Sequence, residues 1–383
     1  MRIARIETFL IPPRYLFCRI ETDSGIVGWG EPVVEGRAEV VRTAVEQLAE
    51  YLLGADPLRI EDHWQVLTRG GFYRGGPVLS SAVAGIDQAL WDIAGKHFGV
   101  PVHRLLGGPV RDRVRMYSWV HGADASELRD SAARAVEAGF TAVKMGGSGR
   151  SPVVPAPADV DAVLAKVAAV REVVGDERGL AIDFHGRMSY AASRVLLPAL
   201  APMGPLFVEE PLLPEHAMHL RSIVESAPVP IATGERLFSR TDFLPALQAG
   251  VAVAQPDLSH AGGISEVRRI AAFAETFGAF LAPHCPLGPI ALAASLQVDL
   301  ATPNFLIQEQ SLGIGYDRAG QAGPLGYVVD TAPFEIEEGH ACRTDRPGLG
   351  VDLDESAVRK ADGSERGWRV PRWRHDDGSH AEW

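Results

Sequence analysis

A chain of 383 residues with 46% hydrophobic and 22% charged side chains is long enough for a barrel-sized domain and a second, smaller one. Its formal net charge of −12 argues against binding to nucleic acid or to an anionic membrane surface. Three sparse cysteines, no signal-like N-terminus and no run of about 20 apolar residues lead us to expect a cytoplasmic protein.

The first 117 residues predict a small α+β domain. Residues 3–11, 17–21 and 26–29 are candidate strands of a meander, separated by Pro12-Pro13 and by a Ser24-Gly25 turn. Helical patterns follow over about 37–53 and 78–98, with a glycine-rich connector at 70–76. Strands followed by helices are typical of a separate α+β domain.

Eight short apolar runs then alternate with alanine-rich helical stretches, which predicts a parallel sheet that can close into a barrel at 118–332. The runs cover residues 115–120, 141–145, 180–185, 206–209, 231–235, 251–257, 280–284 and 305–309. The polar segment 333–383 carries Trp368, Trp373 and Trp383, so we expect it to fold back over another domain.

Ionisable residues end six consecutive strand candidates at near-regular steps; they are Asp183, Glu209, Glu235, Asp257, His284 and Glu309. One strand and one helix account for each step, so these side chains should meet at the C-terminal mouth of the barrel, where active sites lie. A single acid at such a position would more often interact with a helix N-terminus. Six at a regular step favour a functional site.

Asp183, Glu209 and Glu235 are three oxygen donors on adjacent strands, and this donor set suits one Mg²⁺. Zinc is disfavoured because no His or Cys occupies a matching position on the fourth or fifth strand. A divalent cation would stabilise the charge that forms when a proton leaves the carbon beside a carboxylate.

Two histidines are placed to move protons at this mouth. His185 lies two residues after Asp183, so a continuing strand would point both side chains inward. His284 and Asp257 end neighbouring strands, and an aspartate beside a histidine raises its basicity. The third and seventh strands lie nearly opposite, so the two imidazoles would flank the metal. Glu309, if protonated, could donate a hydrogen bond to the substrate carboxylate.

Several further residues have weaker signals. Glu210 should face away from Glu209, and Cys285 away from His284. His260 lies in a Gly-rich segment, where a structural role competes with substrate contact. None of the Gly-Gly pairs forms a phosphate-binding loop.

The chain resembles the mandelate racemase branch of the enolase superfamily, and within it the galactonate dehydratases. The resemblance spans nearly the whole chain. Its motifs are GWGEP (28–32), GFYRGGP (71–77), GIDQALWD (85–92), DFHGR (183–187), FVEEP (207–211), ATGER (232–236), QPDLSHAGG (255–263), APHCPLGP (282–289), QEQ (308–310) and WRHDD (373–377).

The resemblance implies a modified (β/α)7β TIM-type barrel with an α+β capping domain built from both chain ends, at 1–117 and 333–383. It implies one Mg²⁺ per subunit on Asp183, Glu209 and Glu235, and a homo-oligomer. His284, paired with Asp257, would remove the C2 proton of D-galactonate; His185 would protonate the departing C3 hydroxyl, and Glu309 would assist at the carboxylate. Candidate substrate contacts are Arg14, Tyr15, Tyr73, Lys144 and His260.

The chain departs from the racemase pattern at the second strand. That pattern has Lys-x-Lys, whereas this chain has Lys144-Met145-Gly146, and glycine cannot act as a base. Related dehydratases commonly carry Asn there, and a Gly/Pro-rich loop at 146–157 follows. Three alternatives therefore stay open: dehydration of a related aldonate, racemase or cycloisomerase chemistry, and a non-catalytic metal-binding barrel.

Overall fold

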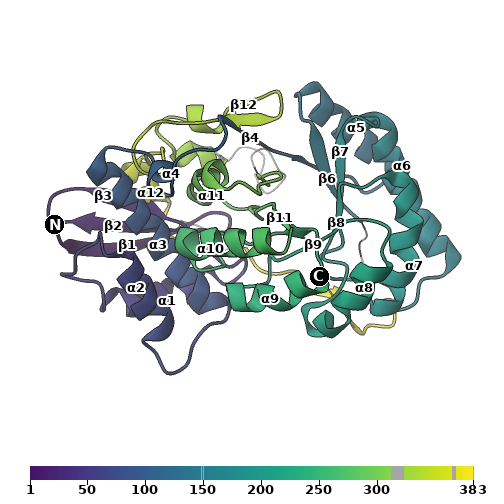
Figure 1. The fold of residues 1–383 in the computed structure, drawn as a ribbon, viewed down its shortest axis with the longest axis horizontal. Helices are drawn as coiled ribbons and strands as arrows, with labels where there is room; N and C mark the ends of the chain where they lie inside the picture. Colours follow the sequence, from purple (N-terminus) through teal and green to yellow (C-terminus); the bar gives the residue numbers. More distant parts are fainter. Residues whose placement is uncertain (148, 150, 312–322, 365–367, 383) are drawn as a thin grey trace.

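The computed structural model describes residues 1–147, 149, 151–311, 323–364 and 368–382, so Trp383 and two residues of the 146–157 loop lie outside the described part. Figure 1 shows the N-terminal half of the cap at one end of the molecule and the barrel, with its outer helices, at the other. Among the described helices none is long and apolar enough to cross a bilayer.

The cap is built on a three-stranded antiparallel sheet of β1 (Ile3–Ile11), β2 (Tyr15–Thr22) and β3 (Val27–Gly30) in the order β1-β2-β3. This is the predicted meander. The cap helices are α1 (Ala38–Ala49), α2 (Ile60–Arg69), α3 (Pro77–Phe98) and the short α4 (Val102–Leu105). The sequence patterns predict α1 and α3, whereas α2 was not predicted.

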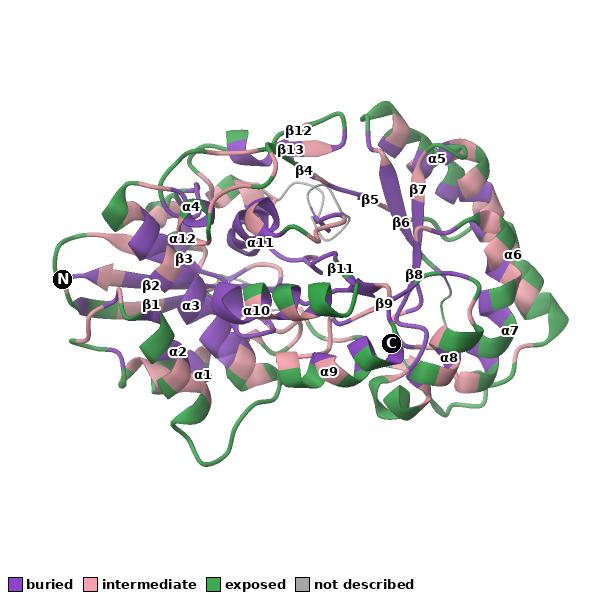
Figure 2. Cartoon of the chain, viewed as in Figure 1, coloured by how far each residue is buried: buried purple, intermediate pink, exposed green. Residues whose placement is uncertain are grey.

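Helix α3 is buried along most of its length because it packs between the cap sheet and α10 (Gly263–Thr276) of the barrel (Figure 2). Gly30 and Gly85 allow the close approach to β3: a Cβ at Gly30 would lie 1.8 Å from the Gly85 carbonyl oxygen. Polar side chains on the other side reach the barrel. Gln88 accepts the Glu31 amide (2.8 Å) and donates to the Leu258 carbonyl (3.1 Å).

The barrel strands form one parallel sheet in the order β11-β10-β9-β8-β7-β6-β5. The strands are β5 (Ser118–Val120), β6 (Ala142–Gly146), β7 (Gly179–Asp183), β8 (Phe207–Glu209), β9 (Ile231–Thr233), β10 (Val253–Ala254) and β11 (Phe280–Leu281). The connecting helices are α5 (Ala125–Glu137), α6 (Pro157–Val174), α7 (Tyr190–Leu200), η1 (Ala201–Met203), η2 (Pro214–His219), α8 (Leu220–Ser226), α9 (Arg240–Ala249), α10 and α11 (Pro289–Ala301).

Side-chain caps fix where several of these helices begin. Asp124 accepts the amides of Ser126 and Glu127 at the start of α5. Ser189 and Ser239 cap α7 and α9 in the same way. Such caps satisfy amides that have no partner within the helix.

The eighth strand candidate, 305–309, closes the barrel through isolated parallel bridges instead of a regular strand. Phe305 pairs with Leu281, and Gln308 pairs with Met116. The first candidate, 115–120, is divided, because β4 (Arg113–Arg115) pairs with the C-terminal segment and only β5 joins the barrel sheet. The predicted barrel is confirmed. Two of its eight predicted strands differ in detail, because 305–309 forms only isolated bridges and 115–120 is divided between two sheets.

An inward-facing apolar layer lies just below the mouth of the barrel. It contains one residue from each strand position: Tyr117, Ala142, Ala181, Phe207, Ala232, Val253, Ala282 and Ile307. Side chains alternate along a strand, so the residue two positions further on also faces inward. This rule gives the next layer, which includes Lys144, Asp183, Glu209, His284 and Glu309.

The C-terminal segment crosses both parts of the molecule. It contains η3 (Pro324–Tyr327), η4 (Ala332–Phe334), β12 (Ile336–Glu337), β13 (His340–Cys342), α12 (Glu355–Ala361), β14 (Trp373–Arg374) and β15 (His380–Ala381). β12 and β13 form a sheet with β4, and α12 packs on β1. The Trp368 amide bonds to the Pro13 carbonyl, and Arg187 lies over the Trp373 ring at 4.7 Å. The segment folds back over the cap, as predicted; the exact domain boundaries stay a prediction.

Asp92 joins three parts of the cap, which gives a test of this arrangement. It accepts the amides of Trp29 (3.0 Å) and Leu349 (2.9 Å), and it pairs with Lys96 at 2.8 Å. Asp92→Ala should lower the free energy of unfolding by about 3–5 kcal/mol, because two buried amides lose their acceptor and the half-buried Lys96 loses its buried partner. Urea unfolding would measure it.

Asp352→Ala is the matched control, since Asp352 pairs with the same lysine but its side chain is 78% exposed. Its loss should cost less than about 1 kcal/mol. Equal effects of the two variants would contradict the structural role of Asp92.

Candidate active site

Three carboxylates converge at the mouth of the barrel. Asp183 and Glu209 are the last residues of β7 and β8, and Glu235 lies two residues after β9. One oxygen from each lies within 4.8 Å of the other two. Asp183 Oδ1 accepts the His185 amide (2.7 Å), whereas Asp183 Oδ2 and Glu209 Oε1 find no hydrogen-bond donor among the described residues. These buried oxygens therefore suit a hard divalent cation such as Mg²⁺.

The Lys144 ammonium supplies a positive charge beside these carboxylates. Its side chain is fully buried on β6, and its ammonium lies 2.6 Å from Glu209, 3.4 Å from Asp183 and 3.5 Å from Glu309. Burial alone would lower the pKa of Lys144, but the surrounding carboxylates hold its pKa well above the ordinary value. The lysine that the sequence placed among the substrate contacts is thus the counter-ion of the carboxylates.

One lysine does not neutralise all of these acids. Burial, and then the charge of Asp183, raise the pKa of Glu209 well above its ordinary value. Burial also raises the pKa of Glu235 to about 7. For Asp183 the effect of burial is outweighed by His185 and Lys144, which lower its pKa. Carboxylates this close compete for one charge, so a further cation at this position would be stabilising.

His284 and Asp257 form the predicted pair. Asp257 Oδ2 lies 2.8 Å from His284 Nδ1, which leaves Nε2 facing the carboxylates, 3.2 Å from Glu235. Asp257 is itself held by the amides of Ser259 and His260. Burial alone would lower the pKa of His284, but Glu309, Glu235 and Asp257 hold its pKa well above the ordinary value.

His185 reaches the mouth for a different reason from the one predicted. The strand β7 ends at Asp183, and His185 has a left-handed backbone with φ of 51°. Its Nε2 lies 3.3 Å from Asp183 Oδ2. Burial lowers the pKa of His185 despite this carboxylate. The two histidines therefore contact opposite ends of the carboxylate group, His185 at Asp183 and His284 at Glu235.

Glu309 accepts two hydrogen bonds in this structure. It receives hydrogen bonds from the Trp119 indole (2.7 Å) and from the Cys285 amide (3.0 Å). Burial alone would raise the pKa of Glu309, but Lys144 and His284 lower it. Donation of a hydrogen bond from a protonated Glu309 to the substrate carboxylate stays a prediction.

Glu210 and Cys285 face away from the site, as predicted. Glu210 is a buried scaffold acid that accepts hydrogen bonds from Thr233 and Arg236. The Cys285 thiol is buried, and burial raises its pKa well above the ordinary value, which is unsuited to a nucleophile.

His260 lies beside the Asp257–His284 pair and contacts the cap. Its Nε2 is 3.3 Å from Glu35, and its Nδ1 is 3.8 Å from Asp257. Burial alone would lower the pKa of His260, but Asp257 and Glu35 raise it to about 9. Glu35 was not predicted from the sequence; it carries no motif, and only the fold brings it to His260.

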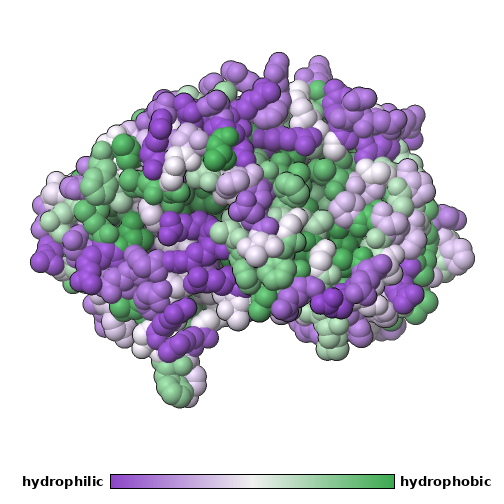
Figure 3. All heavy atoms as spheres, viewed as in Figure 1, coloured by the Kyte–Doolittle hydropathy of each residue, from purple (hydrophilic) through white to green (hydrophobic). Residues whose placement is uncertain are grey.

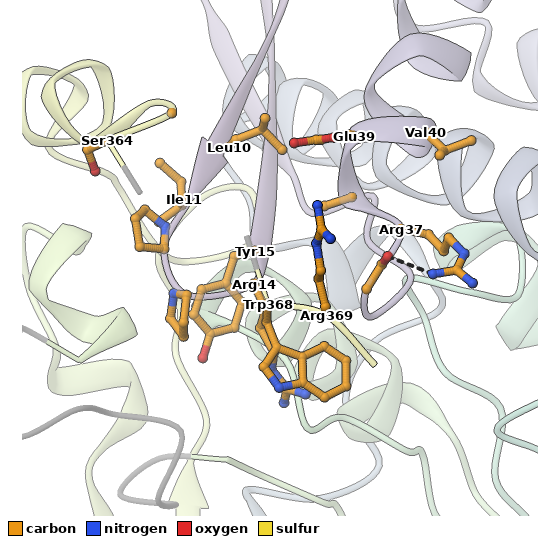
Figure 4. Close-up of a pocket in the computed structure, with 15 residues that line it drawn as sticks. Leu10, Ile11, Arg14, Tyr15, Arg37, Glu39, Val40, Ser364, Trp368 and Arg369 are labelled. Carbon is orange, nitrogen blue, oxygen red and sulfur yellow. Dashed lines mark hydrogen bonds between the residues drawn. The ribbon is translucent and has the colours of Figure 1, made fainter. Parts of the chain in front are cut away.

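The cap residues proposed from the resemblance are Arg14, Tyr15 and Tyr73, and their contact with substrate stays a prediction. Arg14 and Tyr15 line a cavity of about 440 Å³ in the cap together with Trp368 and Arg369 (Figure 4). Arg14 also donates to the Pro286 carbonyl, two residues from His284. Arg14 therefore borders the loop that follows His284.

Tyr73 is placed on the surface. Its side chain is 87% exposed, and its ring lies edge-on against Phe72, which is 90% exposed. Figures 2 and 3 show the loop between α2 and α3 projecting beyond the rest of the molecule. A contact of Tyr73 with substrate in the same chain is therefore not supported by this structure.

Sequence reasoning missed Trp119. This residue of β5 lies two positions after the inward-facing Tyr117, and Lys144 is its partner in register on β6. Strand alternation could have identified it once the inward layer was known.

Two family descriptions match the chain. Residues 10–107 match the N-terminal domain of mandelate racemase and muconate lactonizing enzyme. Residues 127–357, more than half of the chain, match the enolase C-terminal domain-like family. The chain belongs to the enolase superfamily.

Similar members of the enolase superfamily match over the full length. Relatives from Pectobacterium atrosepticum and Ralstonia nicotianae, both named D-galactonate dehydratase, are 49% and 51% identical over 384 residues, covering 100% of each chain. A crystal structure of an enolase from Agrobacterium radiobacter, with sodium and L-malate bound, is 36% identical, covers 100% of both chains and has a TM-score of 0.92. The enolase-superfamily barrel with an α+β cap is thereby confirmed.

Lys144→Met tests the charge balance of this enolase-superfamily site. The variant keeps a side chain of similar length but leaves three buried carboxylates without their cation. In EDTA it should lose about 3–5 kcal/mol of unfolding free energy. Saturating Mg²⁺ should recover much of the loss, because a divalent cation replaces the missing charge.

Lys360→Met on α12 is the control, since this lysine is exposed and far from the carboxylates in sequence. The unfolding free energy of Lys360→Met should stay close to the wild-type value both in EDTA and in saturating Mg²⁺. A Lys144→Met loss that is identical with and without Mg²⁺ would contradict the interpretation.

Proposed function

We propose that the protein is a Mg²⁺-dependent acid-sugar dehydratase that converts D-galactonate into 2-keto-3-deoxygalactonate and water. The single observation that carries the proposal is the placement of two imidazoles at opposite ends of one carboxylate group, with Asp257 behind His284. The full-length relatives named D-galactonate dehydratase support the choice of substrate.

Asp183, Glu209 and Glu235 would hold the Mg²⁺. When bound, the ion would stabilise negative charge on the substrate carboxylate as the C2 proton leaves. The fit rests on the unpartnered buried oxygens of Asp183 and Glu209 and on a donor set made of oxygen alone.

His284 would act as the base. Asp257 at Nδ1 fixes the tautomer, so Nε2, which faces the carboxylate group, can take the C2 proton. His185 then donates its proton to the C3 hydroxyl, the C3–O bond breaks, and water leaves. The remaining enol loses the proton of its C2 hydroxyl, takes a proton at C3 and becomes the 2-keto acid.

A second base at the end of β6 would favour a racemase, but Gly146 occupies that position. The pair of histidines alone still allows a two-base racemisation. The experiments below separate it from elimination, because racemisation would place solvent deuterium at C2 without forming a keto acid.

Glu235→Gln should weaken Mg²⁺ binding by about tenfold or more, because affinity for hard cations follows the charge of the ligand set. Isothermal titration calorimetry on the full chain would measure it. Glu210→Gln is the control: it also removes a buried carboxylate, but one that bonds Thr233 and Arg236. An unchanged Mg²⁺ titration for Glu235→Gln would remove Glu235 from the ligand set.

The wild-type protein with Mg²⁺ should form a keto acid from D-galactonate in a panel of aldonic and aldaric acids. His284→Asn should lower kcat by at least about 100-fold while Mg²⁺ still binds, because a positioned base contributes on this order. His185→Asn should remove elimination more than C2 proton exchange in D₂O.

His216→Asn, on the exposed helix η2, is the control for both variants. Retained dehydration in His284→Asn would contradict its role as base. Equal loss of exchange and elimination in His185→Asn would contradict its role as acid, and a panel without turnover would falsify the proposed function.

A further inference from the structure

Trp119 contacts Glu309 and His185 at the mouth of the barrel. It lies on β5, directly across from Lys144 in register, and its indole is partly buried at the mouth of the barrel. Its edge contacts Glu309, which lies beside the Lys144 ammonium, and its face contacts His185, the acid of the proposed reaction.

The edge of the indole holds Glu309. Trp119 Nε1 donates to Glu309 Oε1 at 2.7 Å, and the Cys285 amide donates to Oε2 at 3.0 Å. The carboxylate is therefore fixed from both oxygens, by the first barrel strand on one side and by the residue after His284 on the other. Two donors to two oxygens leave the plane of the carboxylate little freedom.

The face of the Trp119 indole packs against histidine rings. The Trp119 and His185 rings are stacked, with centroids 6.0 Å apart and an angle of 28° between planes. The His121 ring is also stacked on Trp119, at 5.5 Å and 8°. The Lys144 ammonium lies 4.7 Å from the ring centre, within cation–π range. His185 has a left-handed backbone and lies outside strand β7, so its side chain is restrained by the Trp119 ring and by the contact of its Nε2 with Asp183 (3.3 Å).

We propose that Trp119 is a positioning residue for the dehydration: its N–H fixes Glu309 and its ring fixes His185. The inference rests on the proposed function. The two contacts are separable, because phenylalanine keeps an aromatic face and removes the N–H, whereas leucine removes both.

Trp119→Phe should lower kcat/KM for C2 exchange and for elimination together, by about tenfold, because a hydrogen bond to a charged group is lost. The ratio of exchange to elimination should stay at the wild-type value. Trp119→Leu should lose a similar amount of exchange and a further several-fold of elimination, so that this ratio rises. Both rates come from one assay with D-galactonate and Mg²⁺ in D₂O.

A spectroscopic measurement tests the ring contact without turnover. The Hε1 proton of His185 should show a ring-current shift in the NMR spectrum of the Mg²⁺-loaded protein, largely kept in Trp119→Phe and lost in Trp119→Leu. His121→Ala is the matched control, since it removes the other stacked ring and should leave the ratio unchanged.

Wild-type kcat/KM in Trp119→Phe would overturn the role of the N–H. A wild-type exchange-to-elimination ratio in Trp119→Leu, or an unshifted His185 proton, would overturn the role of the ring. If the wild-type protein neither exchanges nor dehydrates any acid sugar, the proposed function fails instead, and the NMR result still decides whether Trp119 orders His185.

Discussion

The crowding of buried carboxylates around the Lys144 ammonium is the constraint on which this site depends. Asp183, Glu209 and Glu309 all lie within 3.5 Å of it, inside a barrel with little water to screen them. The barrel keeps such a group only with enough positive charge, and one ammonium leaves the pKa of Glu209 raised. The same carboxylates raise the pKa of His284, whose Nε2 faces Glu235. A divalent cation bound to these acids would lower the pKa of His284 again.

Much of this site could be predicted because it follows strand alternation. Asp183 and Glu209 end regular strands, and each lies two residues after an inward apolar residue, so periodicity places them correctly. Strand alternation does not apply where the backbone leaves the strand. His185 and Glu210 have positive φ, and their directions come from the turns. Trp119 carries no motif, and Tyr73 belongs to a motif whose loop projects into solvent, which no pattern of residue types encodes.

The cap was predictable as a meander with helices, but its attachment to the barrel was not. The sequence of helix α3 is mostly hydrophobic, with polar residues at Asp87, Gln88 and Asp92. Only the structure shows that these polar side chains form hydrogen bonds with neighbouring elements. Asp87 accepts the Ser265 amide (2.9 Å) on the barrel side, and Gln88 links the Glu31 amide to the Leu258 carbonyl. A helix buried on two sides must satisfy its polar groups across the boundary that it fills.

Glu31 illustrates how far this attachment reaches. Its own side chain accepts the amides of Gly288 (2.7 Å) and Ala291 (3.0 Å) at the start of α11, four residues after His284, while its amide is held by Gln88. The cap and the base-bearing loop thus share one buried carboxylate. For protein engineering, the cap is not an exchangeable module: a chimera that grafts another cap onto this barrel to change its specificity would have to bring along matching sequences at 257–263 and 284–291.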